Sequence, residues 1–129
     1  MATIKRFEDI EAWQEARELC NLIYPLTVTG SFERDFKLRD QINDSSGSIM
    51  DNIAEGFERD GTREFIQFLS YSKGSAGEVR SQLYRALDRG HISNEVFEML
   101  VKRIEIISKK IRSFMGYLNK TNYKGIKFS

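Results

Sequence analysis

The stretch that decides the fold reads SIMDNIAEGFERDGTREFIQFLSYSKGSAGE, from Ser48 to Glu78. Its apolar side chains recur every three or four residues on both sides of a short interruption, which is the spacing of amphipathic helices. Gly61 breaks the pattern, and Thr62 after it is a good N-cap residue for a new helix. The stretch therefore predicts two long helices joined by a tight turn, at about residues 32–59 and 62–90.

The sequence after this stretch predicts a further helix at about residues 93–119, with Ser93 as its N-cap after the Gly90 stop. Heptad-like spacing in adjacent helices that are joined by a short turn predicts antiparallel packing. A reversal of the chain near His91 would place Leu83 beside Leu100. The residues that step alternately by four and three are Phe65, Leu69, Ser72, Ala76, Val79, Leu83 and Ala86 in one helix, and Phe97, Leu100, Ile104, Ile107, Ile111, Phe114 and Leu118 in the next.

A helix at about residues 9–27 completes the set. Pro25 is expected to end or kink it near its last turn, because proline lacks the helical N–H donor. Gly30 and Ser31 then supply a stop and a fresh N-cap, and residues 120–129 lack periodicity and are expected to fray. We predict one domain over residues 1–129, an all-α, up-down-up-down antiparallel four-helix bundle. The apolar face of this first helix contains Ile10, Trp13, Ala16, Cys20 and Ile23.

Small residues recur on both sides of the Gly61 turn. If the chain reverses there, Ser48 faces Gly74, and Ser45 faces Gly77. A glycine inside a helix costs roughly 0.8–1 kcal/mol relative to alanine, so a close approach of the two backbones would explain these glycines. We favour this packing role over a phosphate-binding loop, because phosphate-binding glycines precede helix N-termini.

A polar stripe accompanies the apolar face of helix 32–59. Glu55 and Arg59 can form an ion pair at i,i+4. The stripe is either a solvent-facing strip or a contact between subunits, in which Asn52 and Arg59 fix the register. The candidate residues for a subunit or helix interface are Ser45, Ser48, Asn52, Glu55, Arg59, Gly74 and Ser75.

The charge is unevenly distributed, although the net charge is only +1. From Val101 to the end, eight basic residues stand against Glu105 alone. Such asymmetry indicates either an electrostatic partner or simply a solvated helix face beside a basic tail. If nucleic acid binds, the candidate contacts are Lys102, Arg103, Lys109, Lys110 and Lys120.

Few side chains are available for chemistry. Cys20 is the one cysteine and His91 the one histidine, which argues against a disulfide and a di-metal bundle site. The Ser-x-x-Lys pattern at Ser70–Lys73 lacks its companion motifs. No apolar run is long enough to span a bilayer, and no signal peptide precedes the first helix. We predict a cytoplasmic non-enzyme without cofactor, metal or membrane association, with Cys20 packed in the core.

The recurring motif resembles the four-helix-bundle proteins encoded by intervening sequences of 23S rRNA. It is also similar to the accessory proteins of diversity-generating retroelements. The resemblance implies a ring-like pentamer, and the retroelement relatives imply a reverse transcriptase as partner. Where the family carries arginines and a Phe-Pro pair, this chain has Asn43-Asp44 and Phe32-Glu33, which weakens inherited nucleic-acid binding on that face. The matching residues are Asn52 to Gly56, Arg59, Glu64-Phe65, Phe68-Leu69 and Gly74-Ser75, with Phe7, Trp13 and Ala16 upstream.

The function predicted from these features is that of a non-enzymatic oligomeric scaffold, which weakly binds RNA or DNA or a nucleic-acid enzyme such as a reverse transcriptase. A purely structural protein–protein assembly module with no nucleic-acid role is the main alternative. A small-molecule pocket inside the bundle or the ring is a third.

Overall fold

The computed structural model describes residues 4–121, and within that range the secondary structure is entirely helical. The prediction of an all-α fold is confirmed. The elements are the short 3-10 helix η1 (Phe7–Asp9) and the α-helices α1 (Glu11–Thr27), α2 (Gly30–Arg34), α3 (Phe36–Glu58), α4 (Thr62–Asp88) and α5 (Asn94–Thr121).

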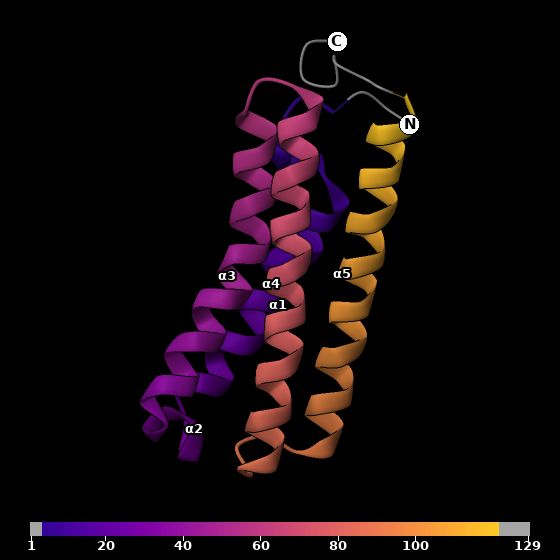
Figure 1. Ribbon diagram of the computed structural model, residues 1–129. Helices are drawn as coiled ribbons and strands as arrows, with labels where there is room; N and C mark the ends of the chain where they lie inside the picture. Colours follow the sequence, from indigo (N-terminus) through magenta and orange to yellow (C-terminus); the bar gives the residue numbers. More distant parts are fainter. Residues whose placement is uncertain (1–3, 122–129) are drawn as a thin grey trace.

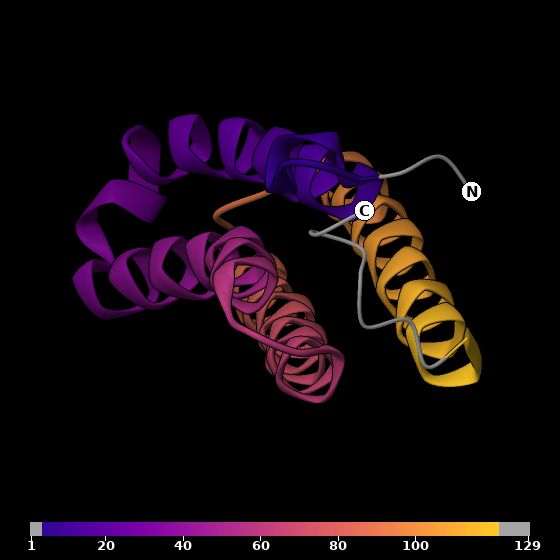
Figure 2. The same ribbon diagram turned by 90° about the horizontal axis from the view of Figure 1, so that it is seen from above.

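Four long helices surround a shared interior. α3 packs against α1 and α4, and α5 packs against α4 and α1, so that α1 and α4 lie diagonally opposite each other. Figure 1 shows the direction of the chain alternating from one long helix to the next, and Figure 2 shows the same helices end-on. This arrangement is compatible with the antiparallel four-helix bundle predicted from the heptad spacing. No helix in the described part of the chain is both long enough and apolar enough to cross a membrane.

The interior is built from the residues that the periodicity selects. Seven-residue patterns place a leucine, isoleucine or alanine on the same face at every turn, and burying each large side chain stabilises the fold by about 1.5–3 kcal/mol. Fully buried positions from all four long helices include Leu19, Ile23, Leu38, Ile42, Ile49, Ile53, Leu69, Ala76, Val79, Ile107 and Ile111.

The predicted helix over residues 32–59 is wrong in one respect, because the structure breaks it at Asp35. The backbone of Asp35 has φ −89° and ψ 74°, which is not helical, and it separates α2 from α3. The break lets both Phe32 and Leu38 enter the core. In one continuous helix these two side chains would point about 120° apart. The N-cap position of α2 is Thr29 rather than Ser31.

The other helix ends lie close to the predicted positions. α1 ends at Thr27, two residues beyond Pro25. Gly61, with φ +110°, takes the N-cap position of α4 that the sequence assigned to Thr62. The Ser93 cap of α5 is confirmed, since its Oγ accepts the Val96 N–H at 3.2 Å. α5 continues to Thr121, past the predicted end, and the remainder of the predicted tail lies outside the described residues.

The register between α3 and α4 agrees with the prediction near their shared turn. The Phe57 and Phe65 rings meet edge to face at 5.9 Å, and Ser72 Oγ donates a hydrogen bond to the Ile49 carbonyl at 2.6 Å. Farther along, Ser45 pairs with Gln82 rather than facing Gly77. The pairing is therefore offset toward the far end of the two helices.

The packing role predicted for Gly74 and Gly77 is wrong. Both glycines are exposed, and a Cβ added to either would meet no atom within 4 Å. The close approach occurs instead at Gly56, where an added Cβ would lie 2.6 Å from Phe68 Cβ. Counting residues back from the turn predicts how far along the helix a residue lies. It does not predict which way the side chain faces, because that depends on the rotation of the helix about its axis. In α4, the residues that face inward are Ser72, Ser75 and Ala76.

Candidate nucleic-acid interface

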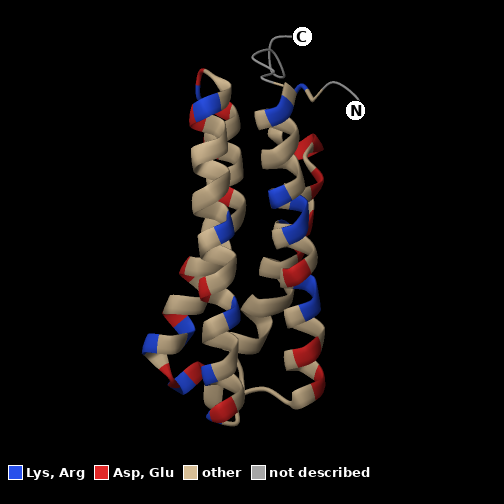
Figure 3. Cartoon of the chain, turned by 45° about the vertical axis from the view of Figure 1, so that its right-hand side comes forward, with Lys and Arg blue, Asp and Glu red and all other residues tan. Residues whose placement is uncertain are grey.

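The outer face of α5 carries three of the predicted cations in an open position. Lys102, Lys109 and Lys120 are exposed, and none of them takes part in the ion pairs found among residues 4–121. Positions 102, 109 and 120 fall on one side of a helix with about 100° per residue. Figure 3 shows the basic residues along this helix and the acidic residues gathered nearer the α4–α5 turn.

Arg103 and Lys110 have partners within the chain. Lys110 Nζ lies 2.8 Å from Glu11 Oε1 and 3.7 Å from Glu15 Oε2. Arg103 Nη1 lies 3.7 Å from Glu15 Oε1 and 3.6 Å from Glu18 Oε2. These pairs tie α5 to α1, and they leave Arg103 and Lys110 less available to phosphates than the three open lysines.

The ion pair between Lys110 and Glu11 shifts the pKa values of both groups. The hydrogen bond to Glu11 raises the pKa of the Lys110 ammonium group. The same bond lowers the pKa of the Glu11 carboxyl. Both groups are therefore charged at neutral pH, and the α1–α5 contact is an attraction of opposite charges at the surface, which salt screens.

A shallow depression lies on the first half of α5, and Lys102 is part of its lining. It is lined by both acidic and basic side chains together with two apolar ones, Met99 and Ile106. The acidic side chains in this lining offset the charge of Lys102, whereas Lys109 and Lys120 do not line the depression. The lining residues are Glu95, Glu98, Met99, Lys102, Arg103 and Ile106.

The predicted interface stripe on α3 and α4 runs from the interior to the surface. Ser45 and Ser75 are buried, and Gln82 Nε2 donates to Ser45 Oγ at 3.0 Å. Ser48 and Asn52 are half-buried, and Asn52 Nδ2 donates to the Ser48 carbonyl at 2.8 Å. Part of the stripe thus serves packing within one chain, and its role between subunits stays a prediction.

Arg59 contacts several other residues of the recurring motif. Its guanidinium contacts Glu55 at 2.8 Å and Glu64 at 3.3 Å, and it lies 5.0 Å from the centre of the Phe68 ring. The predicted pair of Glu55 with Arg59 is confirmed, and the hydrogen bond to Glu55 is the main reason that the pKa of Arg59 is raised. Together with the close approach at Gly56, these contacts hold the α3–α4 turn closed.

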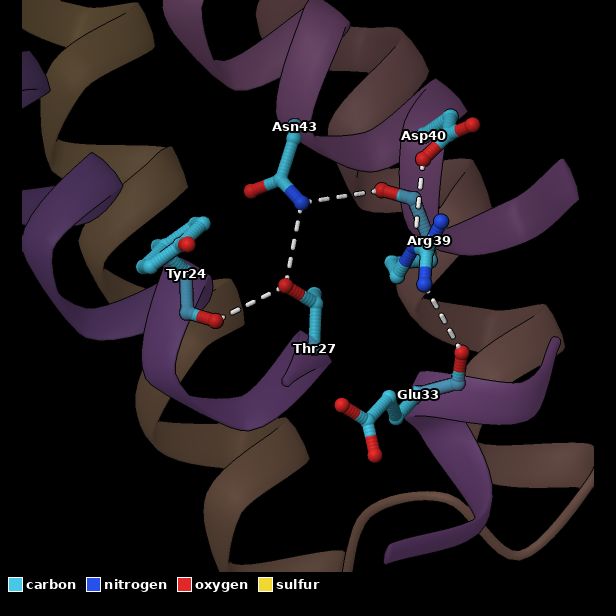
Figure 4. A network of polar contacts seen from close by, with 6 residues as sticks. All are labelled: Tyr24, Thr27, Glu33, Arg39, Asp40 and Asn43. Carbon is cyan, nitrogen blue, oxygen red and sulfur yellow. Dashed lines mark hydrogen bonds and ion pairs between the residues drawn. The ribbon is translucent and has the colours of Figure 1, made fainter. Parts of the chain in front are cut away.

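Asn43 has a structural task at a position where the family resemblance led us to expect an arginine. Its amide nitrogen donates to Thr27 Oγ1 and to the Arg39 carbonyl, both at 3.0 Å. Thr27 is fully buried at the end of α1, and its hydroxyl donates to the Tyr24 carbonyl at 2.7 Å. Figure 4 shows this network joining α1 to α3, with Arg39 reaching the Glu33 carbonyl of α2. Asn43 therefore fastens the corner between α1 and α3.

Cys20 was predicted to pack in the core, but it lies half-buried outside the cluster of buried core residues. Its thiol is half-buried beside Met50, with 3.8 Å between the two sulfur atoms. Burial raises the pKa of the Cys20 thiol, so the thiol is protonated at neutral pH and is a poor nucleophile.

The sequence analysis missed a polar cluster between α2 and the α4–α5 turn. His91 Nε2 lies 2.8 Å from Asp35 Oδ2, and His91 Nδ1 lies 2.7 Å from Ser31 Oγ. Arg89 Nη1 donates to the same Asp35 oxygen at 2.9 Å. His91 is 56 residues from Asp35 and 60 residues from Ser31. No short sequence motif could therefore have predicted these contacts. Within residues 4–121, no three histidine, cysteine or acidic side chains gather as metal ligands.

Comparison with solved structures finds the same fold in a known protein. It is a protein of unknown function from the S23 ribosomal protein family of Bacteroides thetaiotaomicron, with a TM-score of 0.74 and 23% sequence identity. The match covers 81% of this chain and 97% of that chain. No curated protein matches this chain. At this identity the likeness establishes the fold alone.

A family model provides the assignment. The model describes the 23S rRNA-intervening sequence proteins, and it matches residues 8–113, which include all of α1 to α4 and most of η1 and α5. The chain therefore belongs to the 23S rRNA-intervening sequence protein family.

Proposed function

We propose that this protein is a non-enzymatic oligomeric scaffold, built as an antiparallel four-helix bundle, that binds nucleic acid weakly through the outer face of α5. The observation that supports this proposal is the contrast among the cations of α5. Lys102, Lys109 and Lys120 are exposed and have no ion-pair partner among the described residues, whereas Arg103 and Lys110 are paired with α1.

The spacing of the three lysines suits a phosphate backbone. From Lys102 to Lys120 the helix advances about 27 Å, at about 1.5 Å per residue. Phosphates follow one another closely along any strand, so cations at this spacing contact the backbone without reading the bases. Binding is therefore expected to tolerate any sequence.

The expected affinity is low. Three phosphate contacts give a slope of log affinity against log salt of about −2.7 for duplex DNA and about −2 for a single strand. The acidic side chains of α1 and of the first turns of α5 repel the same backbone. We expect dissociation constants of roughly 10⁻⁴–10⁻⁶ M, the range of non-specific binding.

Fluorescence anisotropy with a single-stranded RNA and a DNA duplex tests the proposal at low and physiological salt. Lys102→Gln/Lys109→Gln should weaken binding and flatten the salt slope by about two phosphate contacts. The matched control is Arg63→Gln/Arg80→Gln, which removes two exposed charges from α4. Equal losses in the two double variants would show a general charge effect, and no wild-type binding at low salt would exclude the nucleic-acid role.

A protein partner is the second candidate, favoured by apolar side chains at the surface. Tyr71, Tyr84, Met99 and Ile106 are 40–52% exposed, and exposed apolar groups are typical of association surfaces when they are contiguous. By family resemblance the partners are other copies of this chain in a pentameric ring. The resemblance to the accessory proteins of diversity-generating retroelements adds a reverse transcriptase as a proposed partner, and the proposed location is the cytoplasm.

A further inference from the structure

Three side chains with complementary chemistry form a continuous hydrogen-bonded row. Ser31 Oγ lies 2.7 Å from His91 Nδ1, and His91 Nε2 lies 2.8 Å from Asp35 Oδ2. A hydroxyl, an imidazole and a carboxylate in this order are the parts of an activated nucleophile, its base and the group that orients the base. The row is separate from the lysines of α5 and from the stripe on α3 and α4.

The positions of the protons follow from the partners. Hydrogen bonds from His91 and Arg89 lower the pKa of the Asp35 carboxyl to about 2, so that it is ionised at neutral pH and accepts hydrogen bonds only. His91 Nε2 must therefore carry the proton that Asp35 accepts. In the neutral ring the lone pair is then on Nδ1, and the Ser31 hydroxyl donates its proton toward it.

The base is held rigidly while the hydroxyl is open to solvent. The His91 ring stacks on the buried Phe32 ring, with centroids 5.0 Å apart and planes 17° from parallel. The His91 side chain is only 8% exposed, and its backbone N–H donates to the Ala86 carbonyl at 2.9 Å. Gly90, at φ +74°, makes the turn that brings His91 to this place. Ser31, by contrast, is exposed, so a reagent can reach it.

We propose that Ser31 is an acyl-acceptor site that takes up acyl groups from small activated esters. Ser31 Oγ forms a bond to the carbonyl carbon, and the bond from that carbon to the leaving oxygen breaks. The Ser31 proton passes to His91 Nδ1 and from there to the leaving oxygen, which departs as an alcohol or phenol. Asp35 acts through His91 and is a positioning residue.

The choice of small activated esters follows from the surroundings. The row lies at the surface, where Ser31 is exposed and water weakens any hydrogen bond to a developing oxyanion. A missing oxyanion donor costs a factor of about 10²–10³ in rate. Esters with good leaving groups, such as nitrophenyl acetate, need that stabilisation least.

The experiment treats the full chain with p-nitrophenyl acetate at neutral pH and measures acetylation of each residue by peptide mass mapping. Ser31 should be acetylated at least about a hundredfold faster than Ser93, because general-base catalysis contributes about 10²–10⁴-fold. Ser93 is the matched control, an exposed serine two residues after His91 that caps α5. Lysine acetylation is mapped separately from serine acetylation and does not enter the comparison.

Variants separate the roles. His91→Gln should reduce Ser31 acetylation to the Ser93 rate, and Asp35→Asn should lower it by at least about tenfold, because a neutral amide no longer fixes the imidazole tautomer. Ser93→Ala should leave it unchanged. Circular dichroism checks that each variant is folded.

The pH dependence of Ser31 acetylation in the wild type is a second test, which needs no variant. The groups that face His91 are Ser31 and Asp35, with Arg89 acting on Asp35 from the end of α4. Attack assisted by the His91 base should level off with rising pH once the imidazole is neutral, whereas unassisted attack follows hydroxide throughout. A rate that follows hydroxide without levelling, or a Ser31 rate equal to that of Ser93, would overturn the proposal.

Discussion

At the scale of single residues, two helical glycines differ in the space around them. Gly56 is buried where α3 meets α4, and a Cβ there would lie 2.6 Å from Phe68 Cβ and 3.0 Å from Phe65 Cδ1. Gly74 is exposed, and a Cβ there would meet nothing within 4 Å. Only the first glycine is required by the packing of the chain on itself.

The two glycines should respond to alanine in opposite directions. Gly56→Ala should lower the free energy of unfolding by about 1–3 kcal/mol, because the neighbouring Phe68 Cβ belongs to the helix and cannot swing away. Gly74→Ala should raise it by up to about 1 kcal/mol through helix propensity. This replaces the expectation from the sequence that Gly74 lies where the backbones of the two helices approach closely. Denaturation by urea measures both changes, and an unchanged midpoint for Gly56→Ala would contradict the close approach.

At the scale of elements, the heptad spacing predicted the long helices and their neighbours well. The Phe65 ring meets the Phe114 ring at 5.5 Å and the Tyr84 ring meets the Phe97 ring at 4.8 Å, within about one turn of the predicted levels. Apolar periodicity is a local property of the sequence, so it predicts a helix without knowledge of which element packs against it. The fold was therefore largely predictable from the sequence.

The break at Asp35 and the partners of Arg103 and Lys110 were not predictable in the same way. Asp35 is held by His91 and Arg89, more than 50 residues away in the sequence. The cations of α5 are paired or open depending on which helix lies beside them, and only the fold places the acidic side of α1 there. Sequence spacing gives the direction of a side chain but not its partner.

The docking of α2 should depend on pH through Asp35. The pKa of this carboxyl falls from its ordinary value of 3.8 to about 2 in the folded protein. A lowered folded pKa contributes stability that is present above the unfolded value and is lost as the pH falls through the folded value. The loss therefore belongs to the window from about pH 4 down to about pH 2.

A comparison with Asp35→Asn measures this contribution. Above pH 5 the wild type should be the more stable protein by urea denaturation, and the difference should shrink as the pH falls from about 4 to about 2. Asp60→Asn is the control, because Asp60 is an exposed residue in the α3–α4 turn. A constant difference between wild type and Asp35→Asn over that range would show that the Asp35 carboxylate adds no pH-dependent stability.

At the scale of the whole molecule, the net charge is only +1, but the charged side chains fall into a paired group and an unpaired group. Glu11, Glu15 and Glu18 of α1 compensate Arg103 and Lys110 of α5, so these charges cancel locally. The open lysines on the outer face of α5 are not compensated in this way. The molecule is therefore nearly neutral as a whole, while its exposed, unpaired lysines gather on one helix face.

We predict that the protein forms a homo-oligomer. The family resemblance implies a pentamer. Light scattering at micromolar concentration should give a mass well above the 15.0 kDa of one chain. Tyr71→Glu on α4 and Ile106→Glu on α5 each place a charge on an exposed apolar position, and the variant that lowers the mass identifies the face that is buried on assembly. Glu78→Gln, on the exposed side of α4, is a control that should leave the mass unchanged. A wild-type mass of one chain would exclude assembly, and a mass of two chains would exclude the ring.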